Sequence, residues 1–249
     1  MPNTNISYRD TNYFNSLFCD YIEGSVHLSS FYNNKPNIDN FKNQILSKKE
    51  NFKSYNRLVL RDILLKQYAS IGLPDDIKKC INLIADNNTF TVTTGHQLCL
   101  FTGPLYFLYK IISAINLTEE LKLKYPEFNF IPIYWMATED HDFDEIRSFK
   151  YGNENITWDS NQKGQVGNFS TVNLKDSLDK LSKLLPNTTN SSKFIKLFND
   201  SYIKSNNLTE ATRKLVHELF KNYKLVILDS NEIELKKIFS TTIKNELIN

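Results

Sequence analysis

Two segments of the 249-residue chain gather side chains able to carry out acid–base and electrostatic chemistry. The first, residues 93–104, reads Thr-Thr-Gly-His-Gln-Leu-Cys-Leu-Phe-Thr-Gly-Pro, and the second, residues 138–145, reads Thr-Glu-Asp-His-Asp-Phe-Asp-Glu. Histidine can donate a hydrogen bond to an oxyanion or exchange a proton near neutral pH. Carboxylates can neutralise an ammonium group or hold Mg²⁺ through oxygen. The two segments therefore predict a site with one hydrogen-bond-donating side and one acidic side.

The first segment lies between a predicted strand and a predicted helix. Residues 90–94 are β-branched or aromatic, which is typical of a buried strand, and apolar residues recur at helical spacing from Leu105 to Leu121. Pro104 suits the first position of that helix, because its missing N–H would have no partner there. Gly95 and Gly103 would let a substrate approach the backbone closely, and free N–H groups at the helix start would bind an anion.

The second segment follows another predicted strand. Residues 128–137 are nearly all apolar, as in a strand buried on both faces of a parallel sheet, although Pro132 favours the first residues of a strand or an edge position. Strand, helix and strand together form one right-handed crossover unit. Both histidine-bearing loops should then emerge at the carboxyl ends of neighbouring strands, where α/β proteins bind ligands.

Part of the acidic segment has a purely structural interpretation. Asp142 can cap a helix whose third residue, Glu145, completes a capping box. This explanation leaves Glu139, Asp140 and His141 free for chemistry. Trp135 and Tyr106, beside the two segments, are interpreted as core residues.

Composition excludes several classes of protein. Thirty basic and 28 acidic residues give a net charge of +2, so no strong field points to nucleic acid or a membrane surface. We expect no signal peptide, because the first residues lack a basic region followed by an apolar run, and no membrane span, because no apolar run is long enough. Three separated cysteines fit a reducing cytoplasm. His96 and Cys99 could share a metal, but no second ligand pair exists, so we predict no metal site.

The pattern along the rest of the chain predicts an α/β protein with a helical N-terminal segment. Helices are expected at residues 38–49, 57–70 and 74–85, followed after the strand–helix–strand unit by a hairpin within 147–159 that turns at 152–155, and by a loop at 160–170. Further helices are expected at 176–185, 191–204 and 208–223, a strand at 224–229 and a helix from 232. Because that last pattern has no cap, Gly or Pro to close it, the chain is expected to be a fragment.

These motifs resemble a known family. Thr94-Gly95-His96-Gln97, Phe101 to Tyr106, Tyr109-Lys110 and Trp135 to Ile146 are similar to the cysteine ligase family of bacillithiol biosynthesis. The resemblance is closest over residues 57–150 and looser to the end of the chain. It implies a Rossmann-like core with inserted connecting segments, and a coiled coil used for dimerisation that lies mostly beyond Asn249.

The resemblance also suggests how the chain divides. Residues 1–88 would be a helical segment packing on the core, 89–150 the first part of the core, 151–207 an inserted connecting segment, and 208–249 a continuation of the core.

The implied activity is a carbon–nitrogen ligase that adds cysteine to glucosaminyl-malate. ATP is the expected cosubstrate, no bound cofactor is expected, and the full-length protein would be a cytoplasmic homodimer. Catalytic roles are predicted for His96, Asp140 and His141, and substrate contacts for Gly95, Gln97, Thr102, Gly103, Lys110, Glu139 and Asp142. Two alternatives are a metal-dependent nucleotidyltransferase or hydrolase that binds Mg²⁺ on the acidic loop, and a non-catalytic subunit that binds a sugar or nucleotide.

Overall fold

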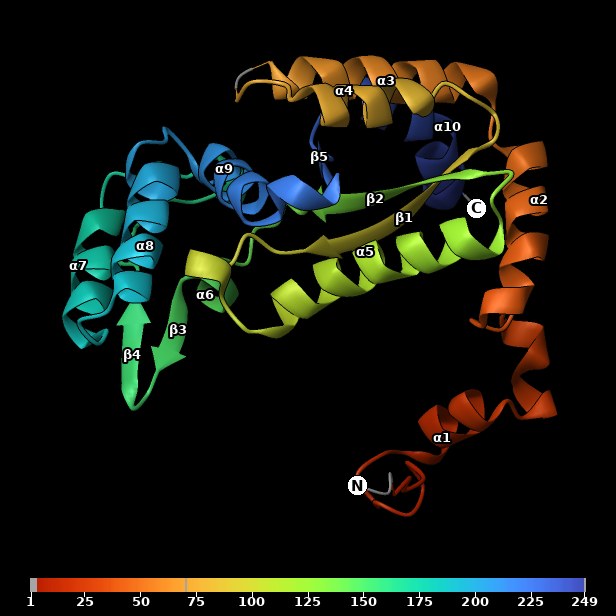
Figure 1. Cartoon of the computed structure of the whole chain (residues 1–249), viewed down its shortest axis with the longest axis horizontal. Coiled ribbons are helices and arrows are strands. Elements are labelled where there is room, and N and C mark those ends of the chain that lie inside the picture. Colours follow the sequence, from red (N-terminus) through yellow and green to blue (C-terminus); the bar gives the residue numbers. More distant parts are fainter. Residues whose placement is uncertain (1–3, 70, 249) are drawn as a thin grey trace. The chain divides into compact units, whose positions relative to one another are not determined.

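A computed structural model describes residues 4–69 and 71–248 of the chain. It forms two compact units, one reaching to Asn51 and the other beginning at Phe52 (Figure 1). In the first unit, α1 (Ser16–Glu23) and α2 (Phe41–Asn51) are separated by two short 3₁₀ turns. The sequence pattern missed α1, which is a short helix closed by Gly24 in the left-handed conformation (φ 75°).

A three-stranded parallel sheet forms the centre of the second unit. Its order is β1 (Thr89–His96), β2 (Asn129–Met136) and β5 (Val226–Asp229). Helix α5 (Tyr106–Lys124) connects β1 to β2 as the predicted crossover. The predicted α/β class with a Rossmann-like parallel sheet is therefore confirmed.

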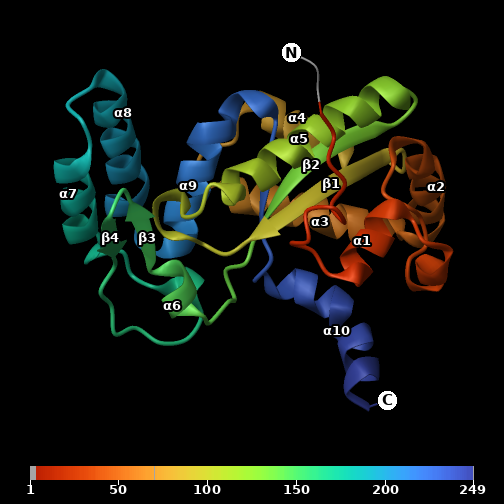
Figure 2. The ribbon, with the colours of Figure 1, turned by 90° about the horizontal axis from the view of Figure 1, so that it is seen from below.

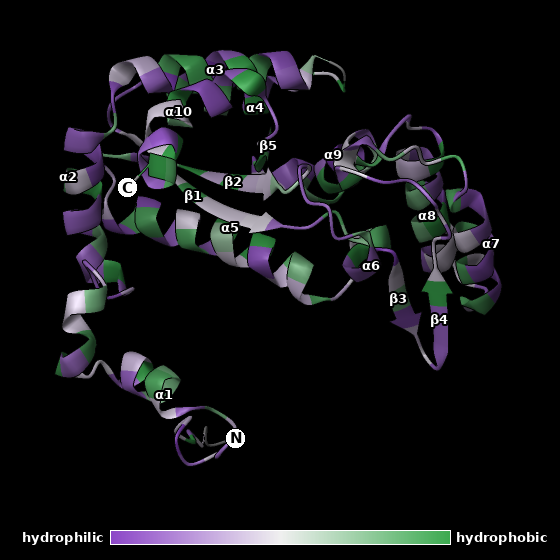
Figure 3. Cartoon of the chain, turned by 180° about the vertical axis from the view of Figure 1, so that it is seen from behind, coloured by the Kyte–Doolittle hydropathy of each residue, from purple (hydrophilic) through white to green (hydrophobic). Residues whose placement is uncertain are grey.

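Helices cover the sheet on both faces. Helix α5 packs on one face, where the Phe107 ring meets Tyr134 of β2 edge to face at 5.5 Å. Helices α3 (Ser54–Tyr68) and α4 (Asp75–Leu83) lie on the other side of the sheet, in contact with β5 (Figures 1 and 2). Figure 3 shows apolar residues of α5 interleaved with polar ones, as expected for a helix with one buried side.

Strand β2 is the central strand, so Pro132 occupies neither a strand start nor an edge strand, contrary to the prediction. In a parallel strand, the N–H groups of alternate residues point to the same neighbouring strand. The N–H groups of Asn129 and Ala137 donate to carbonyls on the β1 side at 2.9 and 3.2 Å. Pro132 has the opposite parity and faces β5, where pairing begins only at Ile133 with Val226. The missing N–H therefore costs no ladder bond.

Side chains, rather than a further strand, close the outer edge of β5. The Ile227 N–H donates to the Tyr68 hydroxyl at 2.8 Å, and the Ile227 carbonyl accepts from Arg213 at 3.0 Å. Gln67 accepts from the Asp229 N–H and donates to its carbonyl, both at 2.9 Å. These contacts satisfy edge groups that would otherwise be buried without partners.

A long segment separates β2 from β5. It contains α6 (Phe143–Ile146), the hairpin β3 (Ser148–Tyr151) and β4 (Glu154–Thr157), α7 (Leu174–Leu184), α8 (Thr189–Phe198) and α9 (Leu208–Phe220). Helix α10 (Ile233–Ile248) follows β5.

The predicted elements of this segment exist, with shifted bounds. The hairpin turn is shorter than 152–155, since Glu154 and Asn155 already belong to β4. The helix expected to run to Lys204 ends at Phe198, where a π-helical turn (Asn199–Ile203) follows. In the N-terminal part, the helix expected over 57–70 ends at Tyr68, and Ser70 lies outside the described residues. The four-part division of the chain remains a prediction.

Candidate functional site

The side chain of Gln97 joins the two chemistry-bearing segments. Its amide nitrogen donates to Asp140 Oδ2 at 3.0 Å and to Glu145 Oε2 at 2.6 Å. The adjacent strand ends carry the segments, with His96 paired to Met136 in the parallel register. Both amide hydrogens of Gln97 are thereby used, so this nitrogen organises the acidic loop and has no hydrogen left for a substrate.

Asp140 is held in its ionised form by its surroundings. The Asp142 N–H donates to Asp140 Oδ1 at 3.0 Å. This bond lowers the pKa of Asp140 most, and partial burial opposes it. Hydrogen bonds from Gln97 and the His141 backbone, and the nearby His141 charge, lower the pKa further. An ionised carboxylate at a sheet edge is suited to binding a cationic group.

His96 is part of β1 rather than of a loop after it, which corrects the prediction. Its side chain is only 8% exposed and packs against the rings of Tyr106 and Phe107 at 4.9 and 5.4 Å. Burial, and then the charge of Lys110, lowers the pKa of His96, so the imidazole is held neutral. Its Nε2 atom lies 3.9 Å from the buried Cys99 thiol, whose pKa burial raises to about 11.

The turn between β1 and α5 has an unusual backbone. Phe101 and Thr102 both have positive φ, 46° and 78°, and Gly103 follows with φ 49°. A Cβ atom at Gly103 would lie 2.4 Å from the Cβ of Cys99, so only glycine fits there. The Phe101 ring stacks on Phe198 at 4.9 Å and meets Tyr202 edge to face, also at 4.9 Å.

The segment between β2 and β5 therefore holds the turn in place. The Tyr202 hydroxyl donates to the Cys99 carbonyl at 3.3 Å, and Tyr202 is fully buried. The sequence pattern missed this role of Tyr202 and Phe198, because a contact about 100 residues away leaves no local signal.

Helix α5 begins at Tyr106, so Pro104 lies before the helix and not at its first position. The N–H groups of Phe107 and Leu108 donate to the carbonyls of Pro104 and Leu105 at 3.0 and 3.1 Å. Thr102 and Gly103, predicted to contact substrate, are half-buried in the preceding turn, and Lys110 is exposed on α5. The predicted anion site at this helix start accordingly has fewer free donors than an ideal helix would supply.

The acidic segment caps a short helix as expected. Asp142 is the N-cap of α6, and its Oδ1 atom accepts from the Glu145 N–H at 3.3 Å. The predicted capping box is not formed, since the Glu145 carboxylate accepts from Gln97 instead. His141 and Asp142 are exposed, while Glu139 is half-buried with its carboxylate 3.5 Å from Lys236 of α10.

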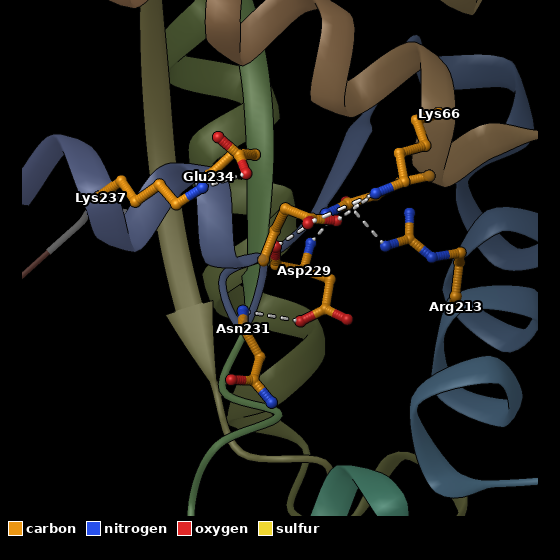
Figure 4. Close-up of polar contacts among 8 residues, drawn as sticks. Lys66, Arg213, Asp229, Asn231, Glu234 and Lys237 are labelled. Atoms are coloured by element: carbon orange, nitrogen blue, oxygen red, sulfur yellow. Dashed lines mark hydrogen bonds and ion pairs between the residues drawn. The ribbon is translucent and has the colours of Figure 1, made fainter.

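Asp229, at the carboxyl end of β5, belongs to the same sheet edge. Its Oδ1 atom accepts from the Thr138 hydroxyl. The same atom accepts from the Asn231 N–H at 3.0 Å (Figure 4). The Thr138 bond ties the end of β5 to the start of the acidic segment. We did not predict Asp229 as a site residue, although a carboxylate closing a predicted strand was a usable signal.

Two aromatic residues next to the site are exposed, contrary to their interpretation as core. Tyr106 is 53% exposed and Trp135 is 39% exposed. Trp135 stands in β2 among side chains that are almost all buried. Both rings can therefore contact a ligand.

Residues 4–69 and 71–248 contain no group of three or more His, Cys, Asp and Glu side chains placed to hold a metal ion. Within the same residues, no helix combines the length and apolar character needed to cross a bilayer.

Comparisons with known proteins agree with this architecture. A family model described as "Bacillithiol biosynthesis BshC, N-terminal Rossmann-like domain" matches residues 1–249. A Flavobacterium johnsoniae protein named "Putative cysteine ligase BshC" is 49% identical over 99% of this chain and 47% of its own length. A protein of the same name from Christiangramia forsetii is 43% identical over 100% of this chain and 47% of its own length. Another, from Bacillus cereus, is 28% identical over 89% of this chain and 42% of its own length.

The chain thus spans about half the length of the curated relatives it matches. The matched region includes both motif segments, the parallel sheet and the helices between β2 and β5. The predicted family resemblance is confirmed: the chain belongs to the BshC family of bacillithiol biosynthesis and matches its N-terminal Rossmann-like domain.

Proposed function

We propose that this chain supplies the substrate site of a cysteine ligase that joins cysteine to glucosaminyl-malate in the synthesis of bacillithiol. The observation that carries the proposal is the pair of hydrogen bonds from Gln97 to Asp140 and Glu145. This bridge holds the histidine-bearing strand and the acidic loop together at one sheet edge. Membership of the BshC family and the name of its relatives support the same activity.

The proposed chemistry needs an activated carboxylate and a neutral amine. Asp140, whose pKa is lowered, and Glu139 would bind the glucosamine ammonium group. His141, exposed at the same loop, would take the proton from the amine before its nitrogen attacks the acyl carbon. The amide bond forms as the activating group departs from that carbon.

The residues around the end of β1 and the start of α5 would stabilise the acyl group by donating hydrogen bonds. His96 is held neutral, and a neutral imidazole can still donate one hydrogen bond to a developing oxyanion. The backbone near Gly95 and Gly103 and the Lys110 ammonium group would contact the remaining anionic groups of the substrates. ATP is proposed as the cosubstrate that activates the cysteine carboxylate, and no resident metal or cofactor is assigned.

The cellular setting is proposed from the family and composition. The protein would act in the cytoplasm on small-molecule substrates, without nucleic acid or membrane partners. A homodimer is proposed for the full-length protein, formed through a coiled coil. Helix α10 supports that assembly, since its residues Phe239, Ile243 and Leu247 are 58%, 50% and 82% exposed.

The activity is tested by incubating the purified protein with glucosaminyl-malate, cysteine and ATP and measuring product mass. We expect His141→Ala to reduce the rate at least 100-fold, on the scale of lost acid–base catalysis. Asp140→Asn should lower kcat/KM for glucosaminyl-malate, because it removes the charge that would hold the ammonium group. Asp144→Asn is the matched control, because that carboxylate is 88% exposed and pairs with Arg147 at 3.2 Å, away from the proposed substrate contacts. A protein that binds glucosaminyl-malate but forms no cysteine adduct, or variants that keep full activity, would contradict the assignment.

A further inference from the structure

The carboxyl end of β2 carries a large exposed ring that the proposed reaction does not use. Trp135 is 39% exposed, whereas Ile131 and Ile133, which precede it on the same face of the sheet, are each 2% exposed. Apolar packing on this face therefore stops one row before the strand ends. The row left open lies at the edge that carries Gln97 and Asp140.

The neighbour of Trp135 on β1 is Gly95, its direct partner in the register. An added Cβ at Gly95 would lie 3.7 Å from the Trp135 Cβ and 3.8 Å from its Cδ1, so the indole runs alongside a bare stretch of backbone. With no side chain at Gly95, the ring stays open toward β1. A flat ligand can approach the indole from that side.

Hydroxyl groups accompany the ring on the same face. Thr91 and Thr93 share the face of β1 with Gly95, and both are exposed. The Thr93 hydroxyl donates to Thr91 at 3.4 Å, which leaves acceptor positions on both threonines. An aromatic plane flanked by hydroxyls suits a ring that is apolar on its faces and hydroxylated on its rim, which describes a pyranose sugar.

The charge around this surface favours a cationic ring over an anionic one. The segment directly after β2 carries Glu139, Asp140 and Asp142, and Asp229 closes the neighbouring strand. Lys236 offsets the charge of Glu139 at 3.5 Å, and the other three carboxylates leave this edge acidic. Carboxylates in this number repel the phosphates of a nucleotide and attract an ammonium group. An amino sugar and a nucleotide base could both stack on the indole, and these carboxylates favour the amino sugar.

We propose that Trp135, with Thr93 beside it, forms the subsite for the amino-sugar ring of the substrate. The pyranose lies on the indole, its rim hydroxyls meet Thr93 in the adjacent row of β1, and its ammonium group points to the acidic loop. This inference rests on the proposed function and names the part of the site that selects the sugar. Trp135 thereby acts as a specificity-determining residue and takes no part in proton transfer.

The test uses the two tryptophans of the chain, Trp135 and the buried Trp158, which is 1% exposed. Protein labelled with ¹⁵N gives one indole N–H signal for each, and Trp135→Phe assigns them. Methyl glucosaminide and glucosaminyl-malate should each shift the Trp135 signal and leave the Trp158 signal in place. Malate alone should shift neither.

Affinity and kinetics give the second readout. Trp135→Ala should raise the KM for glucosaminyl-malate about tenfold, by analogy with the loss of a base stacked on an aromatic side chain. It should change kcat and the KM for cysteine little. Trp135→Phe should recover most of that loss. Thr93→Val, which keeps the shape of an exposed side chain and so preserves the fold, should raise the same KM several-fold.

Each contrary result has a distinct meaning. If ATP shifts the Trp135 signal and the glucosaminide does not, the surface binds a nucleotide base and the sugar subsite is wrong. If calorimetry detects glucosaminyl-malate binding while the Trp135 signal stays fixed, the subsite is wrong and the proposed function stands. If the unaltered protein binds no glucosaminyl-malate, the proposed function fails and this inference fails with it.

Discussion

The position of His96 shows how one residue's chemistry depends on its surroundings. Its ring is buried between aromatic side chains, and burial lowers its pKa. A histidine with a lowered pKa in the folded state remains neutral there while the unfolded chain, with a pKa near 6.5, takes up a proton. Stability from this residue is complete above that value and declines as the pH falls toward the folded pKa.

We therefore expect His96→Gln to weaken the dependence of the free energy of unfolding on pH. Urea unfolding of both proteins at several pH values between 7.5 and 5 measures the effect. The pKa of His217 is also lowered by burial, so His217→Gln should weaken the slope in the same direction. An unchanged slope in His96→Gln would show that the imidazole is as easily protonated in the folded protein as in the unfolded one.

Gly103 is a second residue whose identity is dictated by its site. Gly103→Ala combines a strained φ of 49° with a contact of 2.4 Å to the Cys99 Cβ. We expect a loss of about 2–3 kcal/mol in the free energy of unfolding. Gly152→Ala is the matched control, since its φ is 60° with no atom within 4 Å, and it should cost about 1 kcal/mol. Equal losses would mean that the turn can move away from the added methyl group.

At the scale of elements, the edge of β5 depends on α3. The Tyr68 side chain is fully buried, and burial raises the pKa of its hydroxyl to about 12, so the group stays protonated and can both donate and accept. It accepts from the Ile227 N–H at 2.8 Å. An N-terminal helix thereby completes the hydrogen bonding of a strand about 160 residues away.

Tyr68→Phe should leave the Ile227 N–H buried without a partner and cost about 1–3 kcal/mol. Amide hydrogen exchange at Ile227 should accelerate as well, which separates the edge contact from general packing. Tyr223→Phe, at a side chain that is 55% exposed, should change the stability by less than about 0.5 kcal/mol. A stability loss in Tyr68→Phe without faster exchange at Ile227 would argue against the edge contact.

At the scale of the whole molecule, α10 presents an exposed apolar face. None of its described residues is buried, and Phe239, Ile243 and Leu247 follow one another at intervals of four, which places them on one helical face. An exposed apolar stripe of this kind is a packing surface for another helix.

In the full-length protein, we expect Ile243→Glu to shift the proposed dimer to a monomer in light scattering coupled to size exclusion, because a charge would enter the apolar contact. Lys244→Glu, one residue further along the same helix, is the control and should leave the mass unchanged. A dimer that survives Ile243→Glu would place the interface elsewhere.

Much of the fold followed from local patterns. The spacing of apolar residues predicted α5, α7 and α9, and runs of β-branched, aromatic and apolar residues predicted β1 and β2, because burial acts directly on these patterns. Element ends were less accurate, as at Pro104, where the strained turn before α5 delays the helix to Tyr106. Propensity alone carries no information about a turn that distant aromatic rings hold in place.

The sequence by itself determined the α/β class, the family and the placing of His96 and Asp140 near neighbouring strand ends, because these depend on residue order. Only the tertiary structure decided that Gln97 joins Asp140 to Glu145, that His96 is buried and neutral, and that Trp135 is open to a ligand. Such properties depend on which side chains surround a residue in space. Residues far apart in the chain set those surroundings, and local patterns do not contain them.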